Sequence, residues 1–272
     1  MFLELIVLSD IENKPITLTL VGAGNLAWHL GHAFTEKGLK IDKIINRSTE
    51  SAASLALELG TRYTTNFSVS NSESDFTILA INDSYLEEML LKMNLSETIV
   101  LHTSGSTDID IFNGRVKKFG VLYPLQTFTK NKKIDFSKVP VCIEASDKTT
   151  LNLLLNLASR ISNHAQVMNS EKRRSLHLAA VMANNFTNHI IARTFDFLDK
   201  NGIDKQLILP LLEETLEKIK LIGPKEAQTG PARRNNVEIL NKHLKMIEKE
   251  QELKNLYNAI SDSIIAYYST NS

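Results

Sequence analysis

The chain has 272 residues, enough for one large domain or two of ordinary size. Lysine and arginine number 31 together, as do aspartate and glutamate, so the formal net charge is zero and no global positive field is available to hold a nucleic acid. The single cysteine, Cys142, excludes an intramolecular disulfide. The apolar residues 1–8 carry an acid and are too short to span a bilayer, so we interpret them as an extra strand or a disordered lead-in. We therefore expect a soluble, cytoplasmic protein with neither a nucleic-acid nor a membrane partner.

Short β-type runs alternate with helical patterns in the first half of the chain. Strands are predicted at residues 16–21, 41–45, 76–81, 98–102, 118–123 and 139–144. Helices are predicted between them at residues 26–37, 50–59 and 85–93. Such alternation is typical of βαβ units, so an α/β fold with a doubly wound parallel sheet is predicted.

The first predicted strand runs directly into Gly22-Ala23-Gly24-Asn25-Leu26-Ala27, a G-x-G-x-x-A motif that opens a helical pattern. Gly22 permits the tight turn, Gly24 lets the backbone approach a pyrophosphate, and Ala27 lets the helix pack closely on the strand. The free N–H groups at the helix start would face the phosphates. The motif predicts a dinucleotide site that includes Gly22, Gly24, Asn25 and Leu26.

The second predicted strand ends in Asn46-Arg47-Ser48, where an NAD site would carry an aspartate or glutamate for the ribose 2′-hydroxyl. No carboxylate occupies this strand tip. Arg47 could pair with a 2′-phosphate, and Asn46 and Ser48 could add hydrogen bonds. The alternative is a helix N-cap at Ser48 or Thr49 beside a solvated arginine, which is compatible with phosphate binding. This pattern favours NADP over NAD.

The next strand ends carry further polar residues at the edge where ligands of such sheets bind. Ile81 and Asn82 would lie near the middle of the cofactor, and His102 and Ser104 near its nicotinamide end. His102 could protonate a developing alkoxide or amide, or it could hydrogen-bond a neighbouring turn. Ser104 could contact the cofactor or cap the following helix. Tyr123, at the end of the strand predicted at residues 118–123, could be a half-buried aromatic residue or an acid.

After residue 147 the strand signals vanish and helical periodicity takes over. Helices are predicted at residues 149–162, 170–201, 205–221, 237–248 and 253–268. Gly-containing breakers, such as those at residues 201–202, 223–224 and 230–231, separate the later helices. We therefore predict a dinucleotide-binding domain over residues 1–147 and an all-α substrate domain over residues 148–272.

In the helix predicted at residues 170–201, His177 and Asn184 share one face. A substrate or the nicotinamide amide could satisfy these polar groups, and so could a hydrogen-bond network between helices. His177 is thus a second candidate proton donor, and Asn184 or Asn185 could orient a substrate. The neighbouring Arg173 and Arg174 are expected to be solvated.

The segment at residues 228–236 combines a Gly-Pro turn with Arg233 and Arg234. These arginines could bind a carboxylate, or the segment could be a rigid connector between helices with a basic surface. No cluster of histidine, cysteine or acidic residues has metal-ligand spacing, so no metal site is predicted.

Six motifs in this order resemble a family in which a Rossmann-like domain precedes a helical domain of unknown function, DUF2520, and whose members are named provisionally as NADP oxidoreductases. The matching residues are 22–27, 46–48, 102–105, 123–127, 177–180 with 184–186, and 230–233. The family is similar in plan to F420-dependent NADP reductases, pyrroline-5-carboxylate reductases and the 6-phosphogluconate dehydrogenase-like superfamily. The resemblance implies a Rossmann domain, an all-α C-terminal domain and a homodimer formed through the helices. The chain departs from the family pattern at Arg234-Asn235.

Together these features predict an oxidoreductase that uses NADP(H) to transfer a hydride to or from a small carbonyl or imine compound. His102 or His177 would donate the proton, and Asn184 or Asn185 would orient the substrate. The alternative is a nucleotide-binding sensor or interaction protein without catalytic activity, because a fold does not dictate a function.

Overall fold

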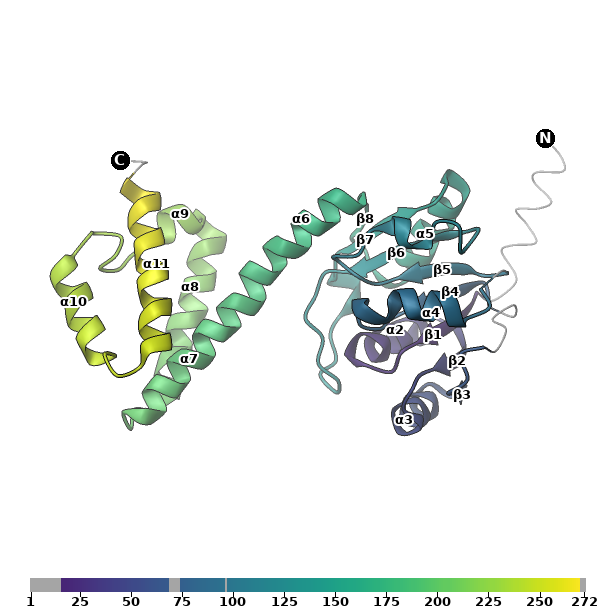
Figure 1. The fold of residues 1–272 in the computed structure, drawn as a ribbon, viewed down its shortest axis with the longest axis horizontal. Helices are drawn as coiled ribbons and strands as arrows, with labels where there is room; N and C mark the ends of the chain where they lie inside the picture. Colours follow the sequence, from purple (N-terminus) through teal and green to yellow (C-terminus); the bar gives the residue numbers. More distant parts are fainter. Residues whose placement is uncertain (1–15, 69–73, 96, 270–272) are drawn as a thin grey trace. The chain divides into compact units, whose positions relative to one another are not determined.

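The computed structural model of the protein describes residues 16–68, 74–95 and 97–269. The chain divides into two compact units, one that ends at Asn185 and one that begins at Phe186. Figure 1 labels the helices and strands of both units. The strand or lead-in predicted at residues 1–8 lies outside the described residues.

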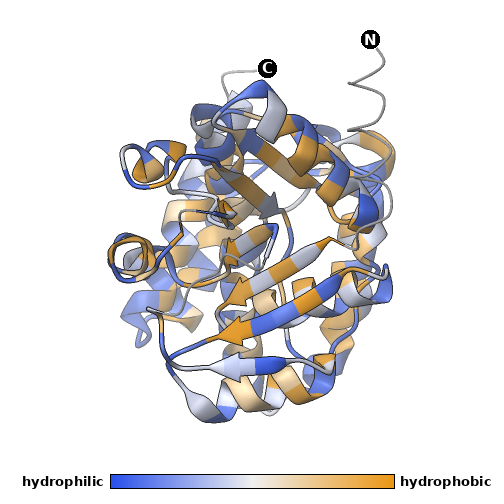
Figure 2. Ribbon diagram, turned by 90° about the vertical axis from the view of Figure 1, so that its right-hand side faces the viewer, coloured by the Kyte–Doolittle hydropathy of each residue, from blue (hydrophilic) through white to orange (hydrophobic). Residues whose placement is uncertain are grey.

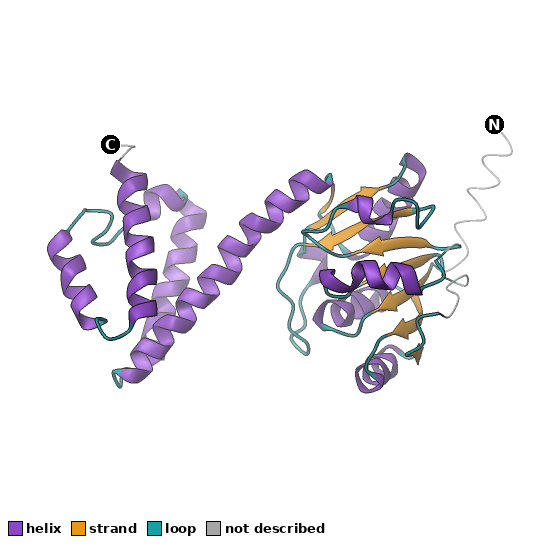
Figure 3. Cartoon of the chain, in the orientation of Figure 1, coloured by secondary structure: helices purple, strands orange, loops and turns teal. Residues whose placement is uncertain are grey.

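In the described part of the first unit, eight strands form one sheet in the order β3-β2-β1-β4-β5-β6-β7-β8, the strands drawn as arrows in Figure 3. The strands are β1 (Thr17–Val21), β2 (Lys40–Ile45), β3 (Arg62–Thr64), β4 (Phe76–Leu79), β5 (Ile99–His102), β6 (Phe119–Pro124), β7 (Val141–Ala145) and β8 (Ala165–Val167). All neighbouring strands run parallel except β6 and β7. The sheet is thus the mostly parallel, Rossmann-type sheet that the sequence predicts.

Helices cover both faces of this sheet. The helices of the first unit are α2 (Asn25–Glu36), α3 (Thr49–Leu59), η1 (Asp83–Tyr85), α4 (Leu86–Lys92), η2 (Ile109–Phe112), η3 (Phe136–Lys138), α5 (Lys148–Ile161) and α6 (Ser170–Ala180). Side chains of α2, α3 and α5 share one buried cluster with Leu18 and Leu20 of β1. Those of α4 and η2 share another with Val21. The alternation along β1 explains this division, because successive side chains of a strand point to opposite faces. Figure 2 shows how apolar residues gather on the strands.

The strand predicted at residues 139–144 exists as β7, but it runs antiparallel to β6. The connection between these strands contains only the short helix η3, whereas parallel strands need a long crossover that is usually an α-helix. The edge strands β3 and β8 were not predicted. Each has three residues that are exposed or half-buried, so neither gives an apolar pattern.

The division between the units falls later than the boundary predicted at residue 147. Leu154 and Leu157 of α5 are fully buried in the cluster that includes β1. Strand β8, beyond α5, pairs with β7 and extends the sheet. Residues 148–167 therefore pack with the sheet, although their helical pattern resembles that of the residues that follow.

The helix predicted at residues 170–201 forms three consecutive helical segments, of which α6 is the first. A π-helical turn, η4 (Val181–Phe186), follows α6 and leads into α7 (Thr187–Lys200). The second unit continues with η5 (Lys205–Ile208), α8 (Leu209–Ile222), α9 (Pro224–Ala227), α10 (Val237–Met246) and α11 (Gln251–Ser269). Every regular element among the described residues of this unit is a helix, as predicted.

Candidate active site

The glycine motif forms the predicted turn at the carboxyl end of β1. Gly22 has a φ of +112°, and a Cβ there would lie 2.2 Å from the carbonyl oxygen of Ala80, so only glycine fits. Gly24 is the N-cap residue of α2, and a Cβ on Gly24 would meet nothing within 4 Å. The space in front of the helix start is therefore open, and its unpaired N–H groups can receive a pyrophosphate.

A cavity of about 340 Å³ adjoins this turn. Its lining includes eight of the predicted cofactor residues: Gly22, Gly24, Asn25, Leu26, Asn46, Arg47, Ile81 and Asn82. Ser48 and Ser104 do not line it, whereas Phe67, Tyr85 and Met89, which were not predicted, do. No sequence motif marks these three residues, because each sits on a separate loop or helix and contributes only apolar or aromatic surface. The cavity and the turn together fit an adenine dinucleotide.

Arg47 projects from the loop after β2. Ser48 caps α3 by accepting a hydrogen bond from the Ser51 amide at 3.2 Å, and Asn46 donates through Nδ2 to the Ser48 carbonyl at 3.1 Å. The guanidinium carbon of Arg47 lies 4.5 Å from the centre of the Tyr85 ring. The cap that was weighed as an alternative is present, and it leaves the guanidinium of Arg47 exposed beside the cavity.

Two of the predicted cofactor-binding residues, Asn82 and Asn25, form hydrogen bonds that hold the backbone of nearby loops. Asn82 caps η1 by accepting hydrogen bonds from the amide and hydroxyl of Ser84 at 3.0 and 2.8 Å. Asn25 donates through Nδ2 to the carbonyl of Phe128 at 2.9 Å, which ties the start of α2 to the loop after β6. Both side chains thus hold backbone at the edge of the cavity.

His102, at the end of β5, is fully buried. Its Nδ1 accepts a hydrogen bond from the Ser104 amide at 3.1 Å, and its ring stacks on Phe112 with centres 5.5 Å apart. Burial, and after it the positive charge of Arg173, lowers the pKa of His102 to about 3. The ring is therefore neutral at physiological pH and closed to solvent. These observations favour a histidine that fixes a neighbouring turn over the predicted proton donor.

Ser104 caps the turn that follows His102, one of the two roles considered for it. Its hydroxyl oxygen accepts from the amides of Ser106 and Thr107 at 3.1 and 2.9 Å. The hydroxyls of Ser104 and Ser106 each donate to the Asp83 carboxylate at 2.6 Å. These bonds link the ends of β4 and β5 in a fixed polar loop.

His177, on α6, meets Tyr123 at the end of β6. The Tyr123 hydroxyl lies 3.0 Å from Nδ1 of His177, and the two rings meet edge to face with centres 5.9 Å apart. A Cβ at position 105 would lie 2.5 Å from the same Nδ1, so Gly105 is what lets the ring approach the loop. His177 is half-buried and Tyr123 is buried. Burial raises the pKa of Tyr123 above its ordinary value, so the phenol stays protonated.

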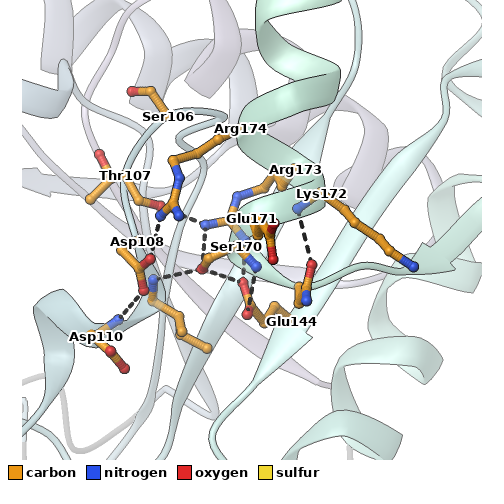
Figure 4. Close-up of polar contacts among 12 residues, drawn as sticks. Ser106, Thr107, Asp108, Asp110, Glu144, Ser170, Glu171, Lys172, Arg173 and Arg174 are labelled. Carbon is orange, nitrogen blue, oxygen red and sulfur yellow. Dashed lines mark hydrogen bonds and ion pairs between the residues drawn. The ribbon is translucent and has the colours of Figure 1, made fainter.

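The expectation that Arg173 is solvated is wrong. Arg173 is fully buried, forms an ion pair with Glu144 of β7 and donates to the Thr107 carbonyl at 2.5 Å. Ser170 binds the same carboxylate through its amide at 2.8 Å and its hydroxyl at 2.7 Å, as Figure 4 shows. Arg174 forms an ion pair with Asp108 and remains half-exposed. This network anchors the start of α6 to the sheet and so fixes the position of His177.

The remaining candidates lie in η4 and the second unit. Asn184 and Asn185 are exposed in the π-helical turn, and Nδ2 of Asn184 lies 3.4 Å from Oδ1 of Asn185. Arg233 stacks on the Tyr268 ring of α11 at 4.3 Å, an arrangement that favours the interpretation of residues 228–236 as a rigid connector.

Among residues 16–68, 74–95 and 97–269, no group of three or more histidine, cysteine or acidic side chains is placed to hold a metal ion. Over the same part of the chain, no helix combines the length and apolar character needed to cross a membrane.

Comparison with known proteins relates the chain to a family of NADP oxidoreductases. Residues 17–105 match the family model described as NADP oxidoreductase, coenzyme F420-dependent, and residues 139–264 match the domain of unknown function DUF2520. A protein of Bacteroides fragilis that is provisionally named an NADP oxidoreductase is 37% identical, with a TM-score of 0.87 over 93% of this chain and 98% of that one. No curated protein gives a significant match.

Two further solved structures share the fold at low identity. An imine reductase from Myxococcus stipitatus in complex with NADP⁺ is 14% identical, with a TM-score of 0.65 over 93% of each chain. A 1-pyrroline-5-carboxylate reductase from Streptococcus pyogenes is 13% identical, with a TM-score of 0.56 over 94% of this chain and 99% of that one. The matched family and the 37% identical relative are both described as NADP oxidoreductases, so the cofactor is NADP, as predicted from the glycine turn and Arg47. The chain belongs to the NADP oxidoreductase family in which a Rossmann-type NADP-binding domain is joined to a DUF2520 domain.

Proposed function

We propose that the protein is an NADPH-dependent reductase of a small carbonyl or imine compound, in which His177 donates the proton. The observation that carries this proposal is the pairing of His177 with Tyr123 at the carboxyl edge of the sheet. When bound, NADPH supplies a hydride to the carbon of the C=O or C=N bond. The chain must then supply a proton to the oxygen or nitrogen of the same bond.

The position of the pair supports this role. The glycine turn follows β1, and Tyr123 lies near the end of β6, three strands away in the same sheet. Neighbouring strands lie about 4.8 Å apart, so the separation across the edge is about 14 Å. That distance is on the order of the reach of the ribose and nicotinamide from a pyrophosphate held at Gly22–Leu26. We infer that the 2′-phosphate lies at Arg47, on the opposite side of the turn.

Tyr123 can support His177 in both protonation states. Its hydroxyl can accept a hydrogen bond from Nδ1–H both in the charged ring and in the neutral ring that remains after Nε2 has given up its proton. The raised pKa of Tyr123 keeps its hydroxyl protonated, so no phenolate charge forms beside the ring. Nε2, at the other edge of the half-buried ring, is the atom that would give its proton to the substrate. Asn184 or Asn185, about two turns further along the helix, would orient the substrate.

We also infer that the protein is a homodimer formed through its helical region. Among residues 186–269 only Ala232, Leu240, Ile247, Ser261 and Tyr268 are buried. Large apolar side chains on one face of α8, such as Leu216 and Ile219, are 58% and 39% exposed. A helical unit of this size that stands alone buries its apolar face, and an unpaired patch of this kind is typical of an interface. A second copy of the chain is the partner that we propose for it.

The reductase proposal is tested by NADPH oxidation with a panel of substrates: a cyclic imine, a linear ketone, an aldehyde and a 2-oxo acid. The wild type should turn over at least one of them. His177→Ala should lower kcat by about 10²–10⁴-fold, the contribution of one positioned proton donor, with NADPH affinity unchanged. His189→Ala, which removes an exposed histidine of α7, is the matched control and should retain full activity. A panel that gives no NADPH oxidation would favour a nucleotide sensor, and undiminished turnover by His177→Ala would remove His177 from the mechanism.

A further inference from the structure

The cavity beside the glycine turn contains a contact for which the sequence gives no signal. The guanidinium of Arg47 lies over the ring of Tyr85, with 4.5 Å between the guanidinium carbon and the ring centre. The two residues come from different crossovers of the sheet, and both line the cavity. A guanidinium within about 6 Å of a ring centre is attracted to the face of the ring. Arg47 is thus held on one side while its other side faces the ligand space.

Local caps hold both partners of this contact. Arg47 lies between Asn46 and Ser48, whose hydrogen bonds close the loop onto the start of α3. Tyr85 ends η1, which begins at the Asn82 cap. The Tyr85 amide also donates to the Asn82 carbonyl at 2.9 Å. Because both backbones are fixed, the side-chain contact restricts a guanidinium that would otherwise sample many rotamers.

We propose that Tyr85 is a positioning residue that holds Arg47 ready for the adenosine 2′-phosphate and thereby sets the preference of the protein for NADPH over NADH. The ring acts through Arg47, so its contribution should appear only with ligands that carry the 2′-phosphate. This inference rests on the binding of NADP and not on the reaction proposed above, so the two can fail separately.

The experiment compares Tyr85→Leu, which removes the aromatic face, with Tyr85→Phe, which keeps it. Dissociation constants for NADPH and NADH are measured by titration calorimetry. We expect Tyr85→Leu to weaken NADPH binding by about threefold to fivefold, the size of an exposed cation–π contact, and to leave NADH binding unchanged. Tyr85→Phe should bind both nucleotides as the wild type does. The same pattern is expected with 2′,5′-ADP and ADP, which present the adenosine end alone.

The Arg47→Ala variant provides the control that tests whether Tyr85 acts through Arg47. In that background Tyr85→Leu should have no further effect on NADPH, because the group that it positions is gone. Unfolding monitored through the fluorescence of Trp28, the only tryptophan of the chain, verifies that each variant keeps its fold. Three results would overturn the proposal: equal losses for NADPH and NADH, which indicate that the ring stacks on adenine; a loss in Tyr85→Phe as large as in Tyr85→Leu; or additive losses in the double variant.

Discussion

The two units of this protein differ in the extent to which their apolar side chains are buried. In the first unit, strands and helices enclose clusters in which residues such as Leu20, Phe34 and Ile78 are fully buried. In the second, α7 and α8 contain no buried residue, although their sequences have apolar faces. The first unit therefore has a core of its own, whereas the second leaves much of its apolar surface exposed.

The two units therefore have different proposed roles: the first holds the candidate site, and the second provides a surface for assembly. The cofactor turn, the Arg47–Tyr85 contact and the Tyr123–His177 pair all lie among residues 22–177, where buried neighbours can hold them in place. The helical unit contributes exposed apolar surface, whose proposed use is assembly. Substitutions in the first unit should accordingly alter stability and binding, and substitutions in the second should alter the oligomeric state.

The largest expected effect concerns the buried ion pair that anchors α6. Arg173→Met removes the partner of Glu144 and leaves a carboxylate at a largely buried position. The free energy of unfolding should fall by about 3–5 kcal/mol. The adjacent pair of Arg174 with Asp108 is half-exposed, so Arg174→Met should cost less than about 1 kcal/mol. Urea unfolding followed through Trp28, in the first unit, measures both. Equal losses for the two variants would contradict the role assigned to Arg173.

The next effect tests the second unit. A double variant, Leu216→Glu with Ile219→Glu, places two charges on the apolar face of α8, because residues three apart lie on one side of a helix. If a second copy covers this face, the dissociation constant of the dimer should rise by about 100-fold or more, as for central residues of an interface. Sedimentation velocity over a dilution series measures this constant.

A matched control for the α8 variant exists in the first unit. Leu57 of α3 is 85% exposed, and Leu57→Glu should leave the dimer intact. A wild-type protein that is monomeric at all concentrations would contradict the proposed assembly. Dissociation by Leu57→Glu would show that the interface lies on the first unit instead.

The smallest of the three effects is a pH dependence that originates in His102. Its pKa is about 3 in the folded protein, against an ordinary value of 6.5. Between these values the unfolded chain binds a proton that the folded protein does not, so stability is lost as the pH falls through this window. Between pH 7.5 and pH 5 the loss from this residue should reach about 2 kcal/mol. His102→Asn should flatten this slope, even if it lowers stability at every pH, and an unchanged slope in thermal or urea unfolding would contradict the assignment.

Much of the first unit could be predicted from its sequence because the governing features are local. The glycine motif, the β-type runs and the absence of a carboxylate near Arg47 are all read within a few residues. The antiparallel direction of β7 and the edge strand β8 could not be read in this way. They depend on the length of a connection and on pairing between segments far apart in the chain.

The same distinction between local features and long-range packing applies to the candidate site. The cavity residues that belong to the glycine motif were predicted, whereas Tyr85 and Met89 join it only through the packing of η1 and α4 against the sheet. His102 and His177 could not be ranked from the sequence, because the ranking depends on burial. In the structure His102 is buried away from solvent. His177 contacts Tyr123, although 54 positions separate the two residues in the sequence.

The most direct test of the central claim follows the hydride itself. The protein is given NADPH that carries deuterium at the reactive C4 position of the nicotinamide, together with a cyclic imine, and the product is analysed by mass spectrometry. The proposed reductase should form an amine with one deuterium on the former C=N carbon, at a rate that falls sharply in His177→Ala. A protein that binds NADPH tightly but leaves the deuterium on the cofactor across the whole substrate panel would contradict the account.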